Sequence, residues 1–229
     1  MPDRRDMAID LMKQQRFAEA LPILVCLTES NPNDWSLYYM AGQCCRFIND
    51  IPKALTLLNK AAILNPNEAQ VFLALGIAHQ LAEQYDLAIK ALKQAVKIEP
   101  TLWTTYNSIG LTYRKLGEFR QALEYYSKAS ECLVENIIKE LLKDREKFYR
   151  EEIIEGKKIL VLLPSAMEKT YQLLRLDPSY AIVMNNIGTS LIQLGEMDSA
   201  REKLKESIEF IPDGYEFSDP YENLNRIRD

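Results

Sequence analysis

The chain has 229 residues, of which 47% are hydrophobic and 27% are charged, as is usual for a folded soluble protein. Its formal net charge of −5 comes with no basic stripe of the kind that neutralises phosphates, which argues against nucleic acid as a main partner. We find no apolar run long enough to span a bilayer and no signal peptide, so we expect a cytoplasmic protein with no membrane insertion.

Five prolines divide the chain at regular intervals. Pro32, Pro66 and Pro100 are 34 residues apart, and so are Pro178 and Pro212. A 34-residue period that bounds two amphipathic helices is typical of a helical solenoid. The first four helix pairs are therefore expected over 1–34, 35–68, 69–102 and 103–136.

Small residues recur at fixed places within these units. Two helices can cross closely only where the side chains between them are small, because a larger one pushes the backbones apart. The eighth position holds Ala8, Gly42, Gly76 and Gly110, and the twentieth holds Ala20, Ala54, Ala88 and Ala122. Gly117 and Gly195 fall between the two helices of their units, where a left-handed residue closes a helix.

These residues resemble the tetratricopeptide repeat. The fourth unit contains YNSIGLTYRKLGEFRQALEYYSKAS, which looks like a near-consensus copy, and the last unit, 181–214, has Gly188, Ala200 and Leu204 in matching positions. The resemblance covers residues 1–136 and 164–214. It implies an all-α fold, a right-handed α-solenoid of about five to six helix pairs whose concave face is formed by the first helix of each pair.

The period breaks between Pro100 and Pro178. Residues 135–155 contain no glycine or proline, and their apolar residues recur at helical spacing. This pattern predicts an elongated helix within 120–158 that interrupts the array near 135–158, either as the second helix of unit four or as the first helix of a degenerate unit five. The second helix of unit five is expected from Pro164 to Leu176.

Four parts are therefore expected along the chain. They are regular units one to four in 1–134, a helical insertion with the first helix of unit five in 135–163, the rest of unit five with unit six in 164–214, and a C-terminal capping segment in 215–229.

The sequence offers no assembly of catalytic groups. His79 is the only histidine and occupies a helix-packing position, and the four cysteines form no C-x-x-C pair. Nucleophile elbows, phosphate loops and H-E-x-x-H motifs are missing. We therefore expect a protein that is not an enzyme, with no catalytic residue, no metal site and no cofactor.

The remaining candidate site is the concave groove that the resemblance implies. The family lines this groove with positions 2, 5, 6, 9, 12 and 13 of each first helix. The first half of the candidate set is apolar and aromatic, and the second half offers amides and hydroxyls that can bond a peptide backbone. The candidate peptide-binding residues are Tyr39, Met40, Gln43, Phe47, Leu73, Ile77, Gln80, Asn107, Ser108, Leu111, Arg114, Asn185, Asn186 and Thr189. An alternative for Leu73 and Ile77 is that they only pack against neighbouring helices.

Three functions fit this groove. The first is a scaffold or adaptor that binds a peptide segment of a protein partner. The second is a chaperone of the secretion-chaperone type, which shields an aggregation-prone client. The third is a structural subunit whose groove is filled by its own chain or by a second copy. The basic residues of a carboxylate clamp are absent apart from Arg5. A homodimer through the apolar stripe 138–149 is a further hypothesis, beside a monomer in which this stripe folds back on units four to six.

Overall fold

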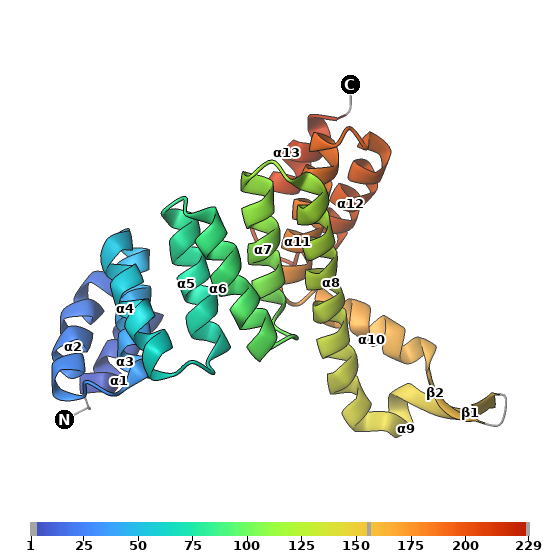
Figure 1. Cartoon of the computed structure of the whole chain (residues 1–229). Coiled ribbons are helices and arrows are strands. Elements are labelled where there is room, and N and C mark those ends of the chain that lie inside the picture. The colour runs from blue at the N-terminus through green and yellow to red at the C-terminus, as the bar shows by residue number, and fades with distance from the viewer. Residues whose placement is uncertain (1–3, 155–156, 228–229) are drawn as a thin grey trace. The chain divides into compact units, whose positions relative to one another are not determined.

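A computed structural model describes residues 4–154 and 157–227, with side chains for 4–144, 147–152 and 161–227. Two compact units follow each other along the chain, Met1–Pro100 and Thr101–Asp229. Both are built mainly from antiparallel helix pairs, which Figure 1 shows in chain order. The predicted all-α solenoid is confirmed for these pairs, and one β-hairpin is added to it.

The first unit consists of three helix pairs. Each pair packs its two helices against each other, and the second helix of one pair packs against the first helix of the next, α2 on α3 and α4 on α5. The helices are α1 (Arg4–Lys13), α2 (Phe17–Ser30), α3 (Trp35–Phe47), α4 (Ile51–Leu64), α5 (Ala69–Leu81) and α6 (Tyr85–Ile98).

The small residues lie where the helices of a pair cross, as predicted. A Cβ atom added to Gly76 would lie 2.5 Å from Cγ of Leu92, and one added to Gly42 would lie 2.7 Å from Cγ of Leu58. Both leucines are fully buried. The helix backbones therefore approach each other as closely as a residue without a side chain allows.

The turn inside each pair needs a left-handed residue. Gly117 and Gly195 both have φ of +78°, in agreement with the sequence prediction. The same position in the first three pairs is occupied by Gln15, Asn49 and Glu83, with φ of 59°, 64° and 57°. The turn geometry is thus a property of the repeat and holds even where the residue has a side chain.

The second unit begins with α7 (Trp103–Lys115) and an elongated α8 (Phe119–Leu141) of 23 residues. It continues through η1 (Leu142–Asp144), α9 (Arg145–Phe148), β1 (Tyr149–Ile154) and β2 (Lys157–Leu162). It ends with α10 (Pro164–Leu174), α11 (Ser179–Gln193), α12 (Met197–Glu209) and α13 (Asp219–Asn225).

The elongated helix exists within the predicted range and belongs to unit four, but the helical insertion predicted over 135–163 is wrong beyond Phe148. Beyond Leu141 the chain turns and forms an antiparallel hairpin, in which Tyr149 pairs with Leu162 and Ile154 with Lys157. The apolar spacing that suggested a helix is also compatible with strands over so short a stretch. The aliphatic run Ile159–Leu162, which follows Gly156 closely, is the strand signal that the periodicity obscured.

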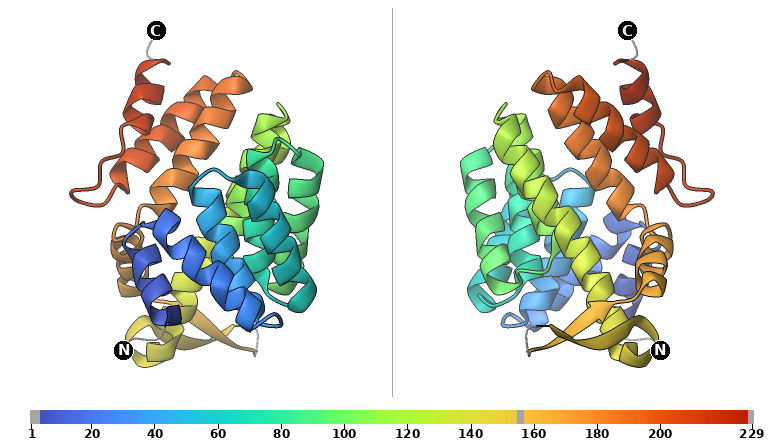
Figure 2. Two further views of the ribbon diagram at one scale, coloured as in Figure 1. Left: turned by 90° about the vertical axis from the view of Figure 1, so that its left-hand side faces the viewer. Right: turned by 90° about the vertical axis from the view of Figure 1, so that its right-hand side faces the viewer.

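The helix pair α11/α12 is the direct continuation of α7/α8. Helix α11 packs on α8 just as α3 packs on α2, and Figure 2 shows α8, α11 and α12 side by side in the second unit. Residues 142–178 are consequently an insertion between two stacked pairs. The predicted first helix of unit five does not exist, and its predicted second helix, α10, packs on α8 and α9.

The insertion has a small apolar core of its own. Leu141, Phe148 and Ala166 are buried together, with Ile137 and Tyr149 packed against them. Much of the stripe 138–149 therefore folds back on its own chain, and Leu141 is only 6% exposed. A dimer through this stripe would have to displace that packing.

The C-terminal helix covers the end of the second unit. Helix α13 packs on α12 and α11, and Leu224 and Ile227 join the buried cluster that contains Leu204. Tyr215 and Tyr221 stay 44% and 50% exposed.

Candidate functional site

The first unit presents an aromatic group at the C-terminal end of α3. Phe47 is 53% exposed and stacks on Phe17, with ring centroids 4.2 Å apart and an interplanar angle of 7°. The guanidinium of Arg46 lies 4.1 Å from the centroid of the Phe47 ring. Burial lowers the pKa of Arg46, and that group remains a cation at neutral pH.

A polar chain runs along α3 beside this group. Gln43 donates from Nε2 to the hydroxyl of Tyr39 at 3.1 Å and accepts from Nε of Arg46 at 2.9 Å. Residues three and four apart share one face of a helix, so the three side chains hold each other in place. We name Tyr39, Gln43, Arg46 and Phe47 the α3 face.

Other predicted residues of the first unit contribute mainly to packing. Leu73 is only 8% exposed, so the packing alternative is the correct one for it. Met40 packs against the buried cluster that contains Leu11 and Leu24. Ile77 and Gln80 are half-buried on α5.

The second unit contains a polar pocket of about 470 Å³ on the first helices of its pairs. We call it the amide pocket. It is lined by Arg114, Asn185, Asn186, Thr189, Ile192, Gln193, Asp219, Glu222, Asn223 and Arg226.

Hydrogen bonds across the helices shape the wall of the amide pocket. Asn186 on α11 donates from Nδ2 to Oδ1 of Asn107 on α7 at 3.0 Å. Arg114 donates from Nη1 to the hydroxyl of Thr189 at 3.1 Å, and that hydroxyl donates to the carbonyl of Asn186 at 3.0 Å. The structure thus brings together Asn107, Arg114, Asn186 and Thr189. By sequence, the first two belong to unit four and the last two to unit six, with a predicted unit five between them.

The C-terminal helix supplies a second wall that the sequence reasoning missed. Asn223 donates from Nδ2 to Oδ1 of Asn185 at 3.0 Å, and Arg226 donates to Oδ1 of Asn223 at 3.3 Å. Asp219, Glu222, Asn223 and Arg226 follow the spacing i, i+3, i+4, i+7, which defines one face of a helix. This spacing is a sequence signal for a polar helix face within 215–229, a segment for which only a capping role is predicted above.

The amides of the pocket are buried but keep hydrogen-bonding capacity. Asn185, Asn186 and Asn223 are 6%, 7% and 9% exposed. An amide side chain can donate two hydrogen bonds and accept two, which is more than the bonds described above use. Together with two guanidiniums and two carboxylates, they form a site suited to a ligand that alternates donors and acceptors, such as a peptide main chain.

Two other predicted pocket residues turn inward. Ser108 is 7% exposed and donates to the carbonyl of Thr104 at 2.8 Å, within its own helix. Leu111 packs against the apolar cluster around Tyr126 and Leu204. Neither adds a polar group to the pocket.

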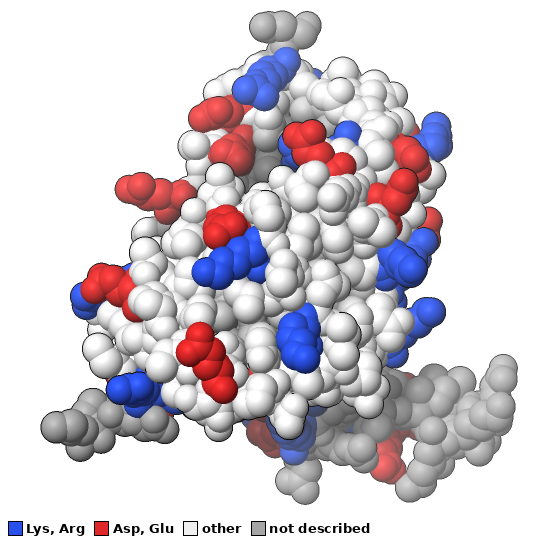
Figure 3. Space-filling view, turned by 60° about the vertical axis from the view of Figure 1, so that its left-hand side comes forward, with Lys and Arg blue, Asp and Glu red and all other residues white. Residues whose placement is uncertain are grey.

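Cys44 and His79 of the first unit both contact groups of their own unit. Burial raises the pKa of the Cys44 thiol to about 11, which keeps it protonated and poorly nucleophilic. Nδ1 of His79 lies 2.7 Å from Oε1 of Gln84. In the described part of the chain, no three metal-binding side chains come together. The face in Figure 3 carries interspersed acidic and basic side chains, with no patch of one sign.

Family models agree with this architecture. Two models described as tetratricopeptide repeat match residues 103–132 and, in two overlapping copies, 5–69 and 46–102. Together these matches span more than half of the chain. The chain belongs to the tetratricopeptide repeat family. Members of this family are generally non-catalytic scaffolds for protein interactions.

Curated relatives share only the repeats. The chain is 30% identical over 95 residues to the BBSome complex member BBS4 of Bos taurus, which is 42% of this chain and 18% of that protein. It is 34% identical over 82 residues to the small glutamine-rich tetratricopeptide repeat-containing protein 2 of Mycosarcoma maydis, 36% of this chain and 23% of that protein. The match thus spans about a fifth of the length of these relatives.

Solved structures show the same fold at low sequence identity. MamA from Desulfovibrio magneticus RS-1 aligns with a TM-score of 0.64 at 18% identity, over 99% of this chain and 95% of that one. The thermophilic tetratricopeptide repeat protein TTC0263 of Thermus thermophilus aligns with a TM-score of 0.64 at 14% identity, over 98% of both chains. Over the described residues, we find no helix with the length and apolarity needed to cross a bilayer.

Proposed function

We propose that this protein is a non-catalytic, cytoplasmic scaffold that binds an extended peptide segment of a protein partner. The observation that carries the proposal is the amide pocket, where buried amides on α11 and α13 are held by hydrogen bonds, one of them to Asn107 on α7, and keep further donors and acceptors. A preorganised set of such groups loses little entropy on binding a main chain. Asn107, Arg114, Asn185, Asn186 and Thr189 are the residues assigned to this contact.

The α3 face of the first unit is proposed as a second contact for partner side chains, separate from the amide pocket. Phe47 is half-exposed and its ring orientation is fixed by Phe17 and Arg46. Rigid aromatic rings at a surface supply large contact area at a low entropic cost, and they are frequent hot spots of binding.

The names of the relatives agree with a partner-binding role. One relative is named as a member of the BBSome complex, and another, from Schizosaccharomyces pombe, as subunit 3 of the anaphase-promoting complex. The latter is 22% identical over 110 residues. Both names describe proteins that work within assemblies, which supports, for this chain, a protein partner over a small-molecule substrate.

A chaperone role is the second candidate. It is favoured by apolar side chains that stay exposed at the ends of α3 and α5, since a client-shielding surface needs such groups. Phe47, Ile48 and Leu81 are 53%, 40% and 51% exposed. Unlike an adaptor, a chaperone would suppress light scattering by a heat-denatured reporter enzyme at equimolar ratio.

We expect Phe47→Ala to weaken peptide binding by about 1–2 kcal/mol, as for an aromatic residue at an interface. The probe is a peptide selected from a display library of random 12-residue peptides on the immobilised full chain, and the measurement is its fluorescence anisotropy. Leu176→Ala is the matched control, because Leu176 is 74% exposed and lies on the second unit. Equal affinity of the two variants would remove the α3 face from the site. Suppressed aggregation of the reporter enzyme, with no peptide selected, would favour the chaperone.

A further inference from the structure

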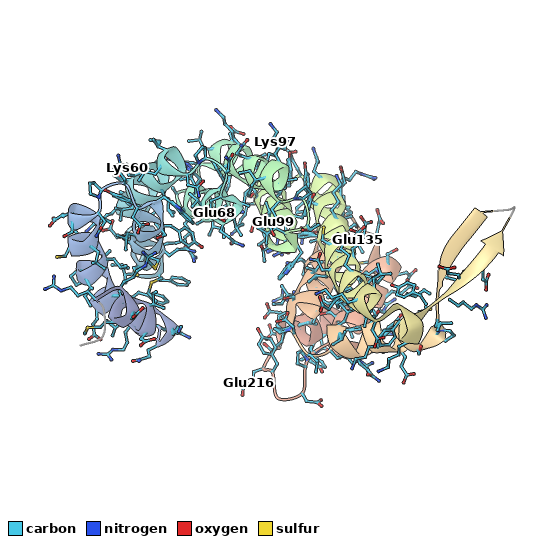
Figure 4. The ribbon with its side chains drawn as sticks, turned by 90° about the horizontal axis from the view of Figure 1, so that it is seen from below. Lys60, Glu68, Lys97, Glu99, Glu135 and Glu216 are labelled. Carbon is cyan, nitrogen blue, oxygen red and sulfur yellow. The ribbon has the colours of Figure 1, made fainter. Side chains whose placement is uncertain are left out.

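The β-hairpin of the insertion leaves the helical part of the second unit and extends away from α8 and α10 (Figure 4). Its base is fixed, since Tyr149 and Leu162 pack against the cluster of Leu141, Phe148 and Ala166. The backbone N–H of Leu163 also donates to the carbonyl of Phe148 at 2.9 Å. Beyond this base, the described sheet consists of β1 and β2 alone.

A two-stranded hairpin in water is marginal in stability, and three or more strands are usually needed. Each of its strands also has one outer edge of backbone groups that can pair with another strand. The two edges of this hairpin differ in sequence.

The edge of β1 has the character of a protected edge. Its first four residues are Tyr-Arg-Glu-Glu, and Arg150 forms an ion pair with Glu152 at 2.5 Å. Charged residues on an edge strand are a common device against pairing with another strand.

The edge of β2 has charged residues only at its first two positions. Its sequence is Lys-Lys-Ile-Leu-Val-Leu, so Ile159–Leu162 is an uninterrupted apolar run without proline or charge. Such runs are typical of strands in the interior of a sheet. The sequence of β2 is therefore that of a central strand, whereas its position within the described sheet is that of an edge.

We propose that β2 pairs antiparallel with β2 of a second copy of this chain, which gives a four-stranded sheet in the order β1, β2, β2 of the partner, β1 of the partner. In the register with full overlap, Lys157 lies opposite Leu162, Lys158 opposite Val161, and Ile159 opposite Leu160 of the other copy. Like charges directly opposite each other destabilise a strand pair, and this register contains no such pair.

Pairing through β1 is disfavoured by the same criterion. In its full-overlap antiparallel register, Glu151 lies opposite Glu152 of the other copy, twice per dimer. Twofold pairing through β2 also closes the assembly, because both outer edges are then the charged β1 strands. This surface is distinct from the amide pocket and from the stripe 138–149, most of which is packed within its own chain.

The first test is the mass of the full chain by sedimentation equilibrium from about 1 to 100 µM, which detects dimers with dissociation constants in that range. We expect approach to twice the chain mass of 26.4 kDa. A single 26.4 kDa species over the whole range overturns the proposal. This holds also if a strand of another protein, and not of a second copy, covers β2.

The second test uses charge pairs. Ile159→Lys with Leu160→Lys places lysine opposite lysine twice, and we expect at least tenfold weaker association, which corresponds to about 1.4 kcal/mol. Ile159→Glu with Leu160→Glu should also be monomeric, whereas an equimolar mixture of the two variants should form a heterodimer. That rescue excludes misfolding of the hairpin. The control, Ile153→Glu with Ile154→Glu on β1, adds two charges that lie opposite Lys158 and Lys157 of the same hairpin, and it should associate as the wild type does. Equally weak association of this variant and of the lysine variant overturns the proposal.

The third test reads the register by disulfide formation in a Cys26→Ser background, since the other cysteines are buried. A mixture of Ile159→Cys and Leu160→Cys chains should form a disulfide-linked dimer faster than either chain alone. Equal rates in all three samples would show that the two strands do not pair in this register.

Discussion

Tyr126→Ala should lower the free energy of unfolding by about 3–5 kcal/mol, the usual loss when a fully buried aromatic side chain is truncated. Tyr126 is 0% exposed and its ring fills the crossing of α7 and α8, where a Cβ on Gly110 would lie 2.6 Å from the ring. Other pairs have a smaller leucine at this place, Leu58, Leu92 or Leu204. Urea denaturation followed by circular dichroism at 222 nm measures the change.

Tyr126→Phe is the control for the ring, and it should leave the stability unchanged or raise it slightly. The Tyr126 hydroxyl is buried without a hydrogen-bond partner among the described residues, and burial raises its pKa. An unpaired buried hydroxyl costs free energy that phenylalanine does not incur. A loss of more than about 1 kcal/mol in Tyr126→Phe would mean that the hydroxyl has a partner, such as an ordered water.

Gly76→Val should destabilise the first unit by about 3 kcal/mol, at the upper end of the usual cost of overpacking. The new Cβ would lie 2.5 Å from Cγ of Leu92, which is fully buried. The loss is expected although glycine is itself a poor helix former.

A double-mutant cycle separates this clash from other effects of the valine. Leu92→Ala removes the atom that the new side chain meets, so Gly76→Val with Leu92→Ala should lose less stability than the two single losses added together. We expect a coupling of about 1–3 kcal/mol, as for residues in direct contact. Additive losses would show that the α5/α6 crossing is not the cause.

The helix pairs could be predicted because the sequence specifies them locally and repeatedly. Gly42, Gly76 and Gly188 each contact the leucine that follows at the same sequence separation within the helix pair. The left-handed turn residue recurs at 34-residue intervals in the first four pairs. Each crossing depends on residues within one unit, and a period repeated several times makes the pattern unambiguous.

The hairpin could not be predicted from periodicity because residues 149–162 satisfy the helical and the strand pattern about equally. The choice depends on the cluster around Leu141 and Phe148, in which Tyr149 and Leu162 become neighbours only through strand pairing. Packing of this kind overrides local preference and is not visible in a window of the sequence.

The amide pocket was predicted in part for a related reason. Asn107 and Asn186 are both predicted peptide-binding residues, but they are 79 residues apart. A degenerate unit five is predicted from the sequence within the segment that separates them. That reading separated α7 from α11, which in the structure are the first helices of adjacent pairs. The contribution of α13 depends on how the C-terminal segment folds back on α11, which no repeat pattern encodes.

Arg114→Gln is the sharpest test of peptide binding in the amide pocket. Arg114 lines the pocket and bonds to Thr189, whereas Lys115→Gln removes the same charge from the next residue of α7, which is exposed and outside the pocket. The measurement is the affinity of both variants for the library-selected peptide. We predict at least tenfold weaker binding for Arg114→Gln, as for the loss of a charged hydrogen-bonding group, and wild-type binding for Lys115→Gln. Equal affinity of the two variants would mean that the peptide does not bind in the amide pocket.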